Sequence, residues 1–90
     1  MSIKNKKQIL PKWFNGVIYE KGDVVTNPFS NESIELSAKE LSMYDFLMGA
    51  NFFLEMMPSN QQSKSILKEF TKGLDWFREN NSKAYMVLLD

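Results

Sequence analysis

Apolar residues are most concentrated between positions 37 and 57, and this stretch organises the fold that the sequence predicts. At 100° per residue, the spacing of an α-helix, its apolar side chains fall on two opposite sides. One side comprises Leu41, Tyr44, Met48, Phe52 and Met56, and the other comprises Met43, Phe46, Leu47, Ala50, Phe53, Leu54 and Met57. A surface helix carries a single apolar stripe, so a helix that is apolar on two sides needs cover on both.

The size of the chain limits how much of this helix it can cover. A subunit of 90 residues has few elements to place over two faces of one helix. We therefore predict that one face packs inside the subunit. Part of the other face, with Tyr44, Met48, Phe52 and Met56, is expected to contact a second copy or a protein partner. The alternative is a monomer in which a hairpin and the other helices enclose this helix on both sides.

Local signals predict where the long helix begins and ends. The hydroxyl of Ser37 can accept from the amide of Glu40, and the Glu40 side chain can accept from the amide of Ser37, which together form a capping box. Pro58 ends the helix, because the residue before a proline is disfavoured in the α conformation.

The residues before this helix have the composition of short strands. Residues 17–19, 24–26 and 33–36 are rich in β-branched and aromatic side chains, and we predict that they form a small antiparallel meander. Gly22 is expected at a turn position with positive φ. In the next loop, Pro28 favours a type I turn and Asn31 tolerates a left-handed backbone.

A second helix is predicted after the long one. Ser59 and Gln62 repeat the spacing of a capping box. An amphipathic stripe then follows, made of Ile66, Leu67, Phe70, Leu74 and Phe77. Gly73 inside this helix is expected to let the two helices approach closely, near Gly49. Trp76 lies off the stripe, so it either packs beneath the C-terminal residues or is an exposed contact residue.

The C-terminal residues are too apolar to extend freely into solvent. We predict a short helix over residues 83–90, capped by Ser82 and docked on the core or on a neighbour. The predicted fold class is α+β: a small antiparallel β-meander, a long central helix, an antiparallel second helix and a short C-terminal helix. Residues 1–12 are expected to be a basic flexible arm, and residues 13–90 a single domain.

The composition offers little catalytic chemistry. The chain contains no cysteine and no histidine, so it lacks thiolates and the commonest general base and metal ligand. Asp45 and Glu55 lie almost three turns apart on one helix, too far for paired acid–base work; a small-ligand pocket between them and Tyr44 is a further hypothesis. We predict no catalytic residue, no cofactor and no metal site. No apolar run approaches the ~18 residues of a membrane span, and no secretory signal is expected, which favours the cytoplasm.

The charge is zero overall but unevenly distributed, because the first 19 residues contain lysines and no acids. One hypothesis is nucleic-acid binding through phosphate contacts from Lys4, Lys6, Lys7 and Lys12, with a base stacked on Trp13. The alternative is that Trp13 and Phe14 insert into the core. We favour the second, because one short cluster lacks the basic stripe of a nucleic-acid-binding protein. The arm could then fold back on its own subunit or lie on a neighbour.

Several runs carry a resemblance to a known group of proteins. They are KGDVVTNPFS at residues 21–30, the Leu41, Tyr44, Asp45 and Phe46 positions of the long helix, WFR at residues 76–78, and AYMVLLD at residues 84–90. This chain resembles small uncharacterised proteins of tailed bacteriophages, notably marine and cyanobacterial ones.

The resemblance implies a phage origin and a role in the cytoplasm of the infected host or in the virion. We therefore expect a non-enzymatic phage accessory protein that forms a homodimer or higher oligomer and binds a host or phage protein. Nucleic-acid binding and a minor virion component are the alternatives.

Overall fold

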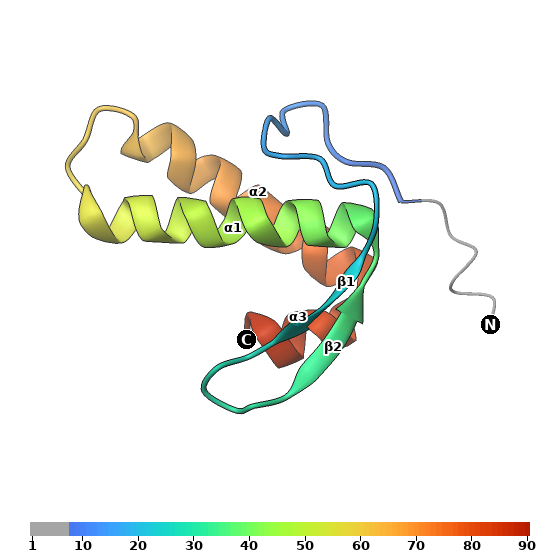
Figure 1. Ribbon diagram of the computed structural model, residues 1–90. Helices are drawn as coiled ribbons and strands as arrows, with labels where there is room; N and C mark the ends of the chain where they lie inside the picture. The colour runs from blue at the N-terminus through green and yellow to red at the C-terminus, as the bar shows by residue number, and fades with distance from the viewer. Residues whose placement is uncertain (1–7) are drawn as a thin grey trace.

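The protein folds as a two-stranded antiparallel sheet followed by three helices, which confirms the α+β class (Figure 1). The structure, a computed structural model, describes residues 8–90. Its elements are β1 (Asp23–Thr26), β2 (Ser33–Leu36), α1 (Ala38–Met56), α2 (Ser63–Asn80) and α3 (Ser82–Leu88).

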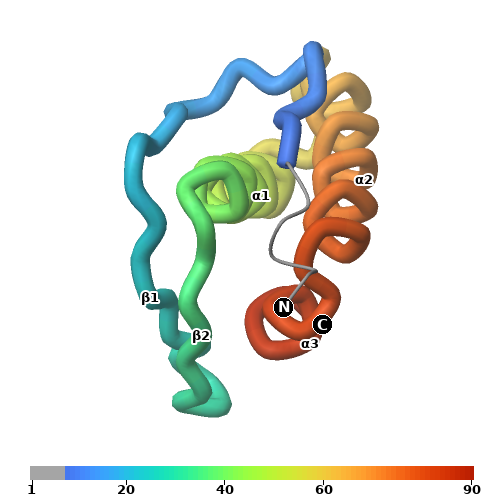
Figure 2. The backbone as a smooth tube through the Cα atoms, turned by 90° about the vertical axis from the view of Figure 1, so that its right-hand side faces the viewer, coloured from blue at the N-terminus to red at the C-terminus, as the bar shows by residue number. Residues whose placement is uncertain are grey.

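Helix α1 lies at the centre of a layered arrangement. In the view along α1, the hairpin lies on one side of this helix and α2 on the other (Figure 2). The segment that leads into β1 crosses over α1 between these two layers, and α3 packs against both α2 and β2. The fully buried core forms where the elements meet, and it comprises Leu36, Met43, Leu47, Phe77 and Ala84.

The predicted capping box at the start of α1 is confirmed. The amide of Glu40 donates to the Ser37 hydroxyl at 3.2 Å, and the amide of Ser37 donates to Glu40 Oε1 at 2.9 Å. The helix ends at Met56, two residues before Pro58, as expected from the restriction that proline places on the residue before it.

The sheet has two strands rather than the three of the predicted meander. Strands β1 and β2 pair with Asp23 opposite Leu36 and Val25 opposite Ile34. Residues 17–19 form no strand, so the predicted third strand is wrong. The amide of Tyr19 donates instead to the buried Ser42 hydroxyl of α1, at 2.9 Å.

The two turns of the hairpin region differ in how well they were predicted. Asn31 has φ of 67°, which confirms the left-handed position. The positive φ expected for Gly22 is wrong, since no glycine of the described chain has one. Gly22 is needed for space: a Cβ there would lie 2.0 Å from the carbonyl oxygen of Leu36.

Helix α2 begins later than its predicted cap implies. Its first residue is Ser63, and no side chain caps it, so Ser59 does not cap the helix. The intervening turn is held by Asn60, whose Oδ1 accepts from the amide of Gln62 at 2.9 Å. The hydroxyl of Ser63 donates back to the carbonyl of Met57 at 2.6 Å, which closes the connection between the two helices.

Gly73 allows the close approach of α1 and α2, as expected, but not at Gly49. A Cβ on Gly73 would lie 2.9 Å from Leu47 Cδ2 and 3.1 Å from Met43 Sδ. A Cβ on Gly49 would meet nothing within 4 Å. The helices therefore meet closely at one glycine only, beside the N-terminal half of α1.

The short C-terminal helix is confirmed, although Asn81 rather than Ser82 caps it. Asn81 Oδ1 accepts from the amide of Ala84 at 3.1 Å, and its Nδ2 donates to Glu40 Oε1 at 3.1 Å. The hairpin holds the other end of α3, since Asn27 Nδ2 donates to the carbonyl of Val87 at 2.8 Å.

Candidate protein-interaction site

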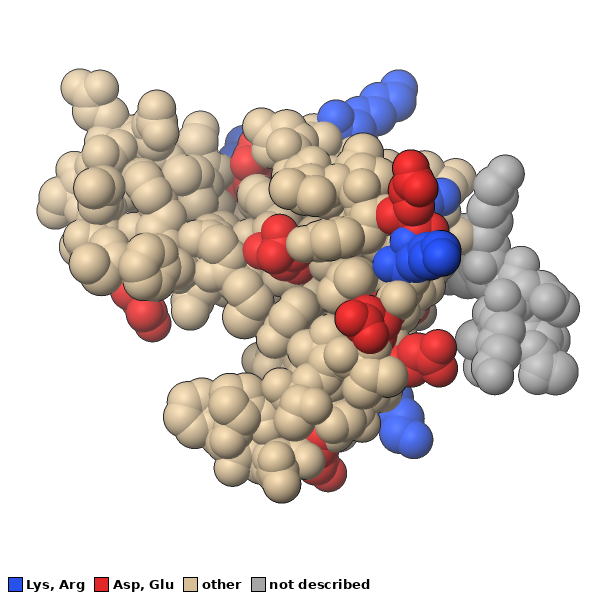
Figure 3. All heavy atoms as spheres, in the orientation of Figure 1, with Lys and Arg blue, Asp and Glu red and all other residues tan. Residues whose placement is uncertain are grey.

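Three large apolar side chains on consecutive turns of α1 are left bare; we call them the outer face. Met48, Phe52 and Met56 are 37%, 63% and 65% exposed. Their spacing of four residues places them along one side of the helix. Figure 3 shows few charged side chains at the left end of the molecule, where the C-terminal half of α1 lies.

The outer face is bare because the hairpin and α3 cover only the first half of α1. The C-terminal half of α1 extends beyond both of them and runs beside α2 alone (Figure 1). Nearer the start of the helix, Leu41 and Tyr44 are partly buried against the core. Within residues 8–90, Phe46 and Phe53 are half-buried while Phe52 is not, so the described subunit does not enclose the helix on both sides.

Tyr44 and Trp76, which were also predicted as contact residues, lie in packed positions. The Tyr44 ring is 6.5 Å from that of Phe77, and burial raises the pKa of its phenol. Trp76 is partly buried, and its indole Nε1 donates to the carbonyl of Ile9 at 2.9 Å. The structure therefore brings together three of the five candidate residues and places these two elsewhere.

The candidate nucleic-acid residues are spread between different environments. Lys12 is exposed, whereas the centre of the Trp13 ring lies 5.7 Å from that of Phe46, and Trp13 and Phe14 are partly buried against the core. Lys4, Lys6 and Lys7 lie outside the described residues. The packing of Trp13 matches the core interpretation of this cluster.

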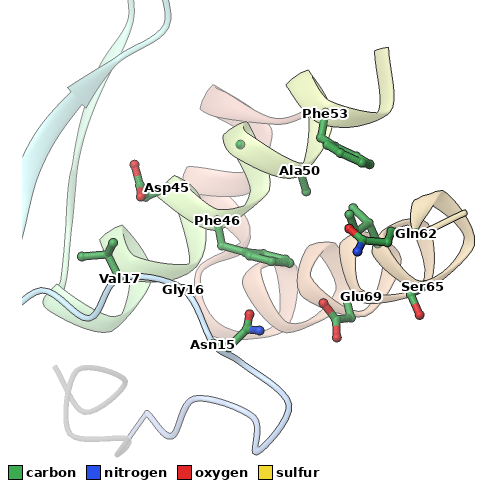
Figure 4. A pocket seen from close by; sticks show the side chains of 12 residues that line it. Asn15, Gly16, Val17, Asp45, Phe46, Ala50, Phe53, Gln62, Ser65 and Glu69 are labelled. Carbon is green, nitrogen blue, oxygen red and sulfur yellow. The ribbon is translucent and has the colours of Figure 1, made fainter. Parts of the chain in front are cut away.

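A second candidate surface is a depression between α1 and α2, which we call the α1–α2 groove (Figure 4). It is a shallow depression of about 680 Å³ that is largely open to solvent. Apolar side chains and two glycines form much of its wall, and polar side chains from α1, α2 and residue 15 complete it. Its lining residues are Asn15, Gly16, Val17, Asp45, Phe46, Gly49, Ala50, Phe53, Gln62, Ser65, Ile66 and Glu69.

The groove is acidic in its electrostatics. Asp45 on α1 and Glu69 on α2 both line it, and no lysine or arginine does. Within residues 8–90, the ion pair that forms joins Arg78 to Asp75 at 2.7 Å, so neither groove carboxylate forms an ion pair with a described lysine or arginine. The groove contains Asp45 but neither Tyr44 nor Glu55, so it is not the ligand pocket expected between those three residues.

The sequence indicated the outer face but not the groove. The outer face follows from helical spacing alone, whereas the groove depends on how α2 and the segment around Gly16 approach α1. One signal was present in Gly49, a glycine inside a helix that the subunit's own packing does not require.

Over residues 8–90, no three carboxylates are grouped as a metal ion would need, and no helix is long and apolar enough to cross a membrane. Comparisons of the chain with protein-family models, with curated proteins and with solved structures found no match.

Proposed function

We propose that this protein is a non-enzymatic protein-binding protein that self-associates through the outer face of α1. The observation that carries the proposal is the bare row of Met48, Phe52 and Met56. Single exposed apolar residues are normal on protein surfaces, but a contiguous apolar row is typical of an interaction site. Phenylalanine and methionine are also side chains that protein interfaces favour.

A second copy suits this face because the row is nearly symmetric about its centre. In an antiparallel pair of α1 helices centred on Phe52, Met48 of one copy faces Met56 of the other. Glu55 then faces Gly49, which has no side chain, so the acidic groups of the two copies do not oppose each other. A two-fold interface requires this kind of self-complementarity.

The available chemistry supports a binding role over catalysis. Without histidine or cysteine, the chain lacks the usual general base and the strongest nucleophile. The resemblance to small phage proteins adds the expectation that the dimer works in the infected host cell and binds a host or phage protein there.

The test is sedimentation of Phe52→Gln beside a matched variant, Phe29→Gln. Phe29 at the hairpin turn is 97% exposed, so both variants remove an exposed phenylalanine but only one alters the outer face. We expect wild type and Phe29→Gln to dimerise with the same dissociation constant, and Phe52→Gln to dimerise at least about tenfold more weakly, a loss of about 1.4 kcal/mol. A wild-type chain that stays monomeric to about 100 μM would contradict the proposal.

A further inference from the structure

We propose that the outer face of α1 is a redox-sensitive contact, and that oxidation of Met48 and Met56 to methionine sulfoxide releases the second copy. The inference deepens the proposed self-association and rests on it. It gives that association a chemical control: the reduced chain forms a dimer, and the chain oxidised by hydrogen peroxide separates into monomers.

Methionine supplies all of the sulfur in this chain, which has six methionines and no cysteine. Two of the three side chains on the outer face are methionines, with Met48 37% and Met56 65% exposed. Met43 lies on the same helix but is 0% exposed. An oxidant in solution therefore reaches the methionines on the bare side of α1, whereas the methionine in the core is covered.

The packing of α1 against α2 protects Met43 further. A Cβ built on Gly73 would lie 3.1 Å from the sulfur of Met43, so the two helices are already in close approach at this sulfur. An oxygen added to Met43 would compete for the same space, and this residue should react only when the core opens. Oxidation in the folded chain is thereby directed to the exposed methionines.

The reaction adds one oxygen atom to each thioether. A lone pair of the methionine sulfur attacks one oxygen of hydrogen peroxide, and the S–O bond forms as the O–O bond breaks. The second oxygen leaves as water with both peroxide protons, so the sulfur loses two electrons and the peroxide gains them. The product is a polar, chiral side chain, and methionine sulfoxide reductases return each of its two epimers to the thioether.

The positions of the two methionines make the outer face sensitive to this change. They lie four residues before and four residues after Phe52, so two sulfoxides would place a polar oxygen on each side of the apolar row. No side chain of the row can donate a hydrogen bond to that oxygen. Burying it against the same face of a second copy is unfavourable, whereas water solvates it in the separated chains.

The first test treats the protein with hydrogen peroxide and follows each methionine by peptide mass spectrometry. In dilute protein, we expect Met48 and Met56 to oxidise at least about tenfold faster than Met43. Above the dimer dissociation constant, oxidation should slow at Met48 and Met56 but not at Met86, which is 66% exposed on α3, away from the outer face. Equal rates at Met43 and Met48, or no slowing at the two outer-face residues, would overturn the proposal.

The second test measures the dimer dissociation constant by sedimentation before and after oxidation. We expect oxidised wild type to dimerise at least about tenfold more weakly, and reductase treatment to restore its affinity. Replacing both outer-face residues, Met48→Leu with Met56→Leu, keeps apolar bulk without a reactive sulfur, so peroxide should leave this dimer unchanged. The matched control, Met57→Leu with Met86→Leu, removes two exposed methionines outside the outer face and should lose affinity on oxidation as wild type does.

The outcomes separate this inference from the proposed self-association. A wild-type dimer whose dissociation constant is unchanged by peroxide overturns the inference and leaves the proposed function standing, whereas a wild-type chain that is always monomeric overturns both. If the Met48→Leu and Met56→Leu variant still dissociates on oxidation, the sensitive methionine lies elsewhere and the assignment is wrong. Circular dichroism should show unchanged helix content in the oxidised chain; loss of helix in step with dissociation would mean that oxidation unfolds the subunit, which also overturns the inference.

Discussion

Two glycines inside helices have opposite roles, and a methyl group added to each should show it. Gly49→Ala adds a Cβ in open space, so we expect the free energy of unfolding to rise by up to about 1 kcal/mol through helix propensity. Gly73→Ala places its Cβ against Leu47 and Met43 in the core, and we expect a loss of about 1–3 kcal/mol from overpacking. Urea denaturation of both variants at low concentration measures the difference. Equal stabilities would show that α1 can move away from α2 without cost.

Glu40 is a buried carboxylate that joins three parts of the chain. It is 5% exposed, and its oxygens accept from the amide of Ser37, from Gln8 Nε2 and from Asn81 Nδ2. The arm, the start of α1 and the junction of α2 with α3 therefore meet at this one side chain.

Replacing one carboxylate oxygen with an amide would place an N–H donor against other donors. We expect Glu40→Gln to lower the free energy of unfolding by about 1–3 kcal/mol, because it leaves a buried group unsatisfied. Urea denaturation measures the effect, with Glu35→Gln as the exposed control. A change no larger than in the control would mean that water replaces these hydrogen bonds.

At the scale of elements, what could be predicted is what local sequence determines. The limits of α1 follow from a capping box and a proline that act within a few residues. The start of α2 could not be predicted in the same way. The hydroxyl of Ser63 donates a hydrogen bond to the carbonyl of Met57, and the helix begins at Ser63 without using Ser59 as its cap. Residues 17–19 have the composition of a strand, but composition alone does not supply a pairing partner. The amide of Tyr19 donates instead to the Ser42 hydroxyl of α1.

The same distinction applies to the two candidate surfaces. The outer face is a property of one helix, so spacing along the sequence predicts Met48, Phe52 and Met56. The groove joins Asp45 of α1 to Glu69 of α2 and to the turn near Gly16, residues that only the crossing of separate elements brings together.

At the scale of the whole molecule, the cover on α1 is unequal along its length. Its first half lies between the hairpin, α2 and α3, while its second half has α2 on one side and the bare outer face on the other (Figures 1 and 2). Regions with fewer buried contacts open more readily than the core, so stability should differ between the two halves.

Amide hydrogen exchange can measure that difference and relate it to self-association. In dilute protein, we expect residues 50–56 to exchange at least about tenfold faster than residues 41–47, because their side of the helix lacks cover. Dimerisation through the outer face should then raise protection of residues 50–56 as concentration increases, with little change in 41–47. Phe52→Gln should remove the concentration dependence and Phe29→Gln should keep it. Uniform protection along α1 at every concentration would mean that α2 alone stabilises the exposed half, and that the bare row does not depend on a partner for its order.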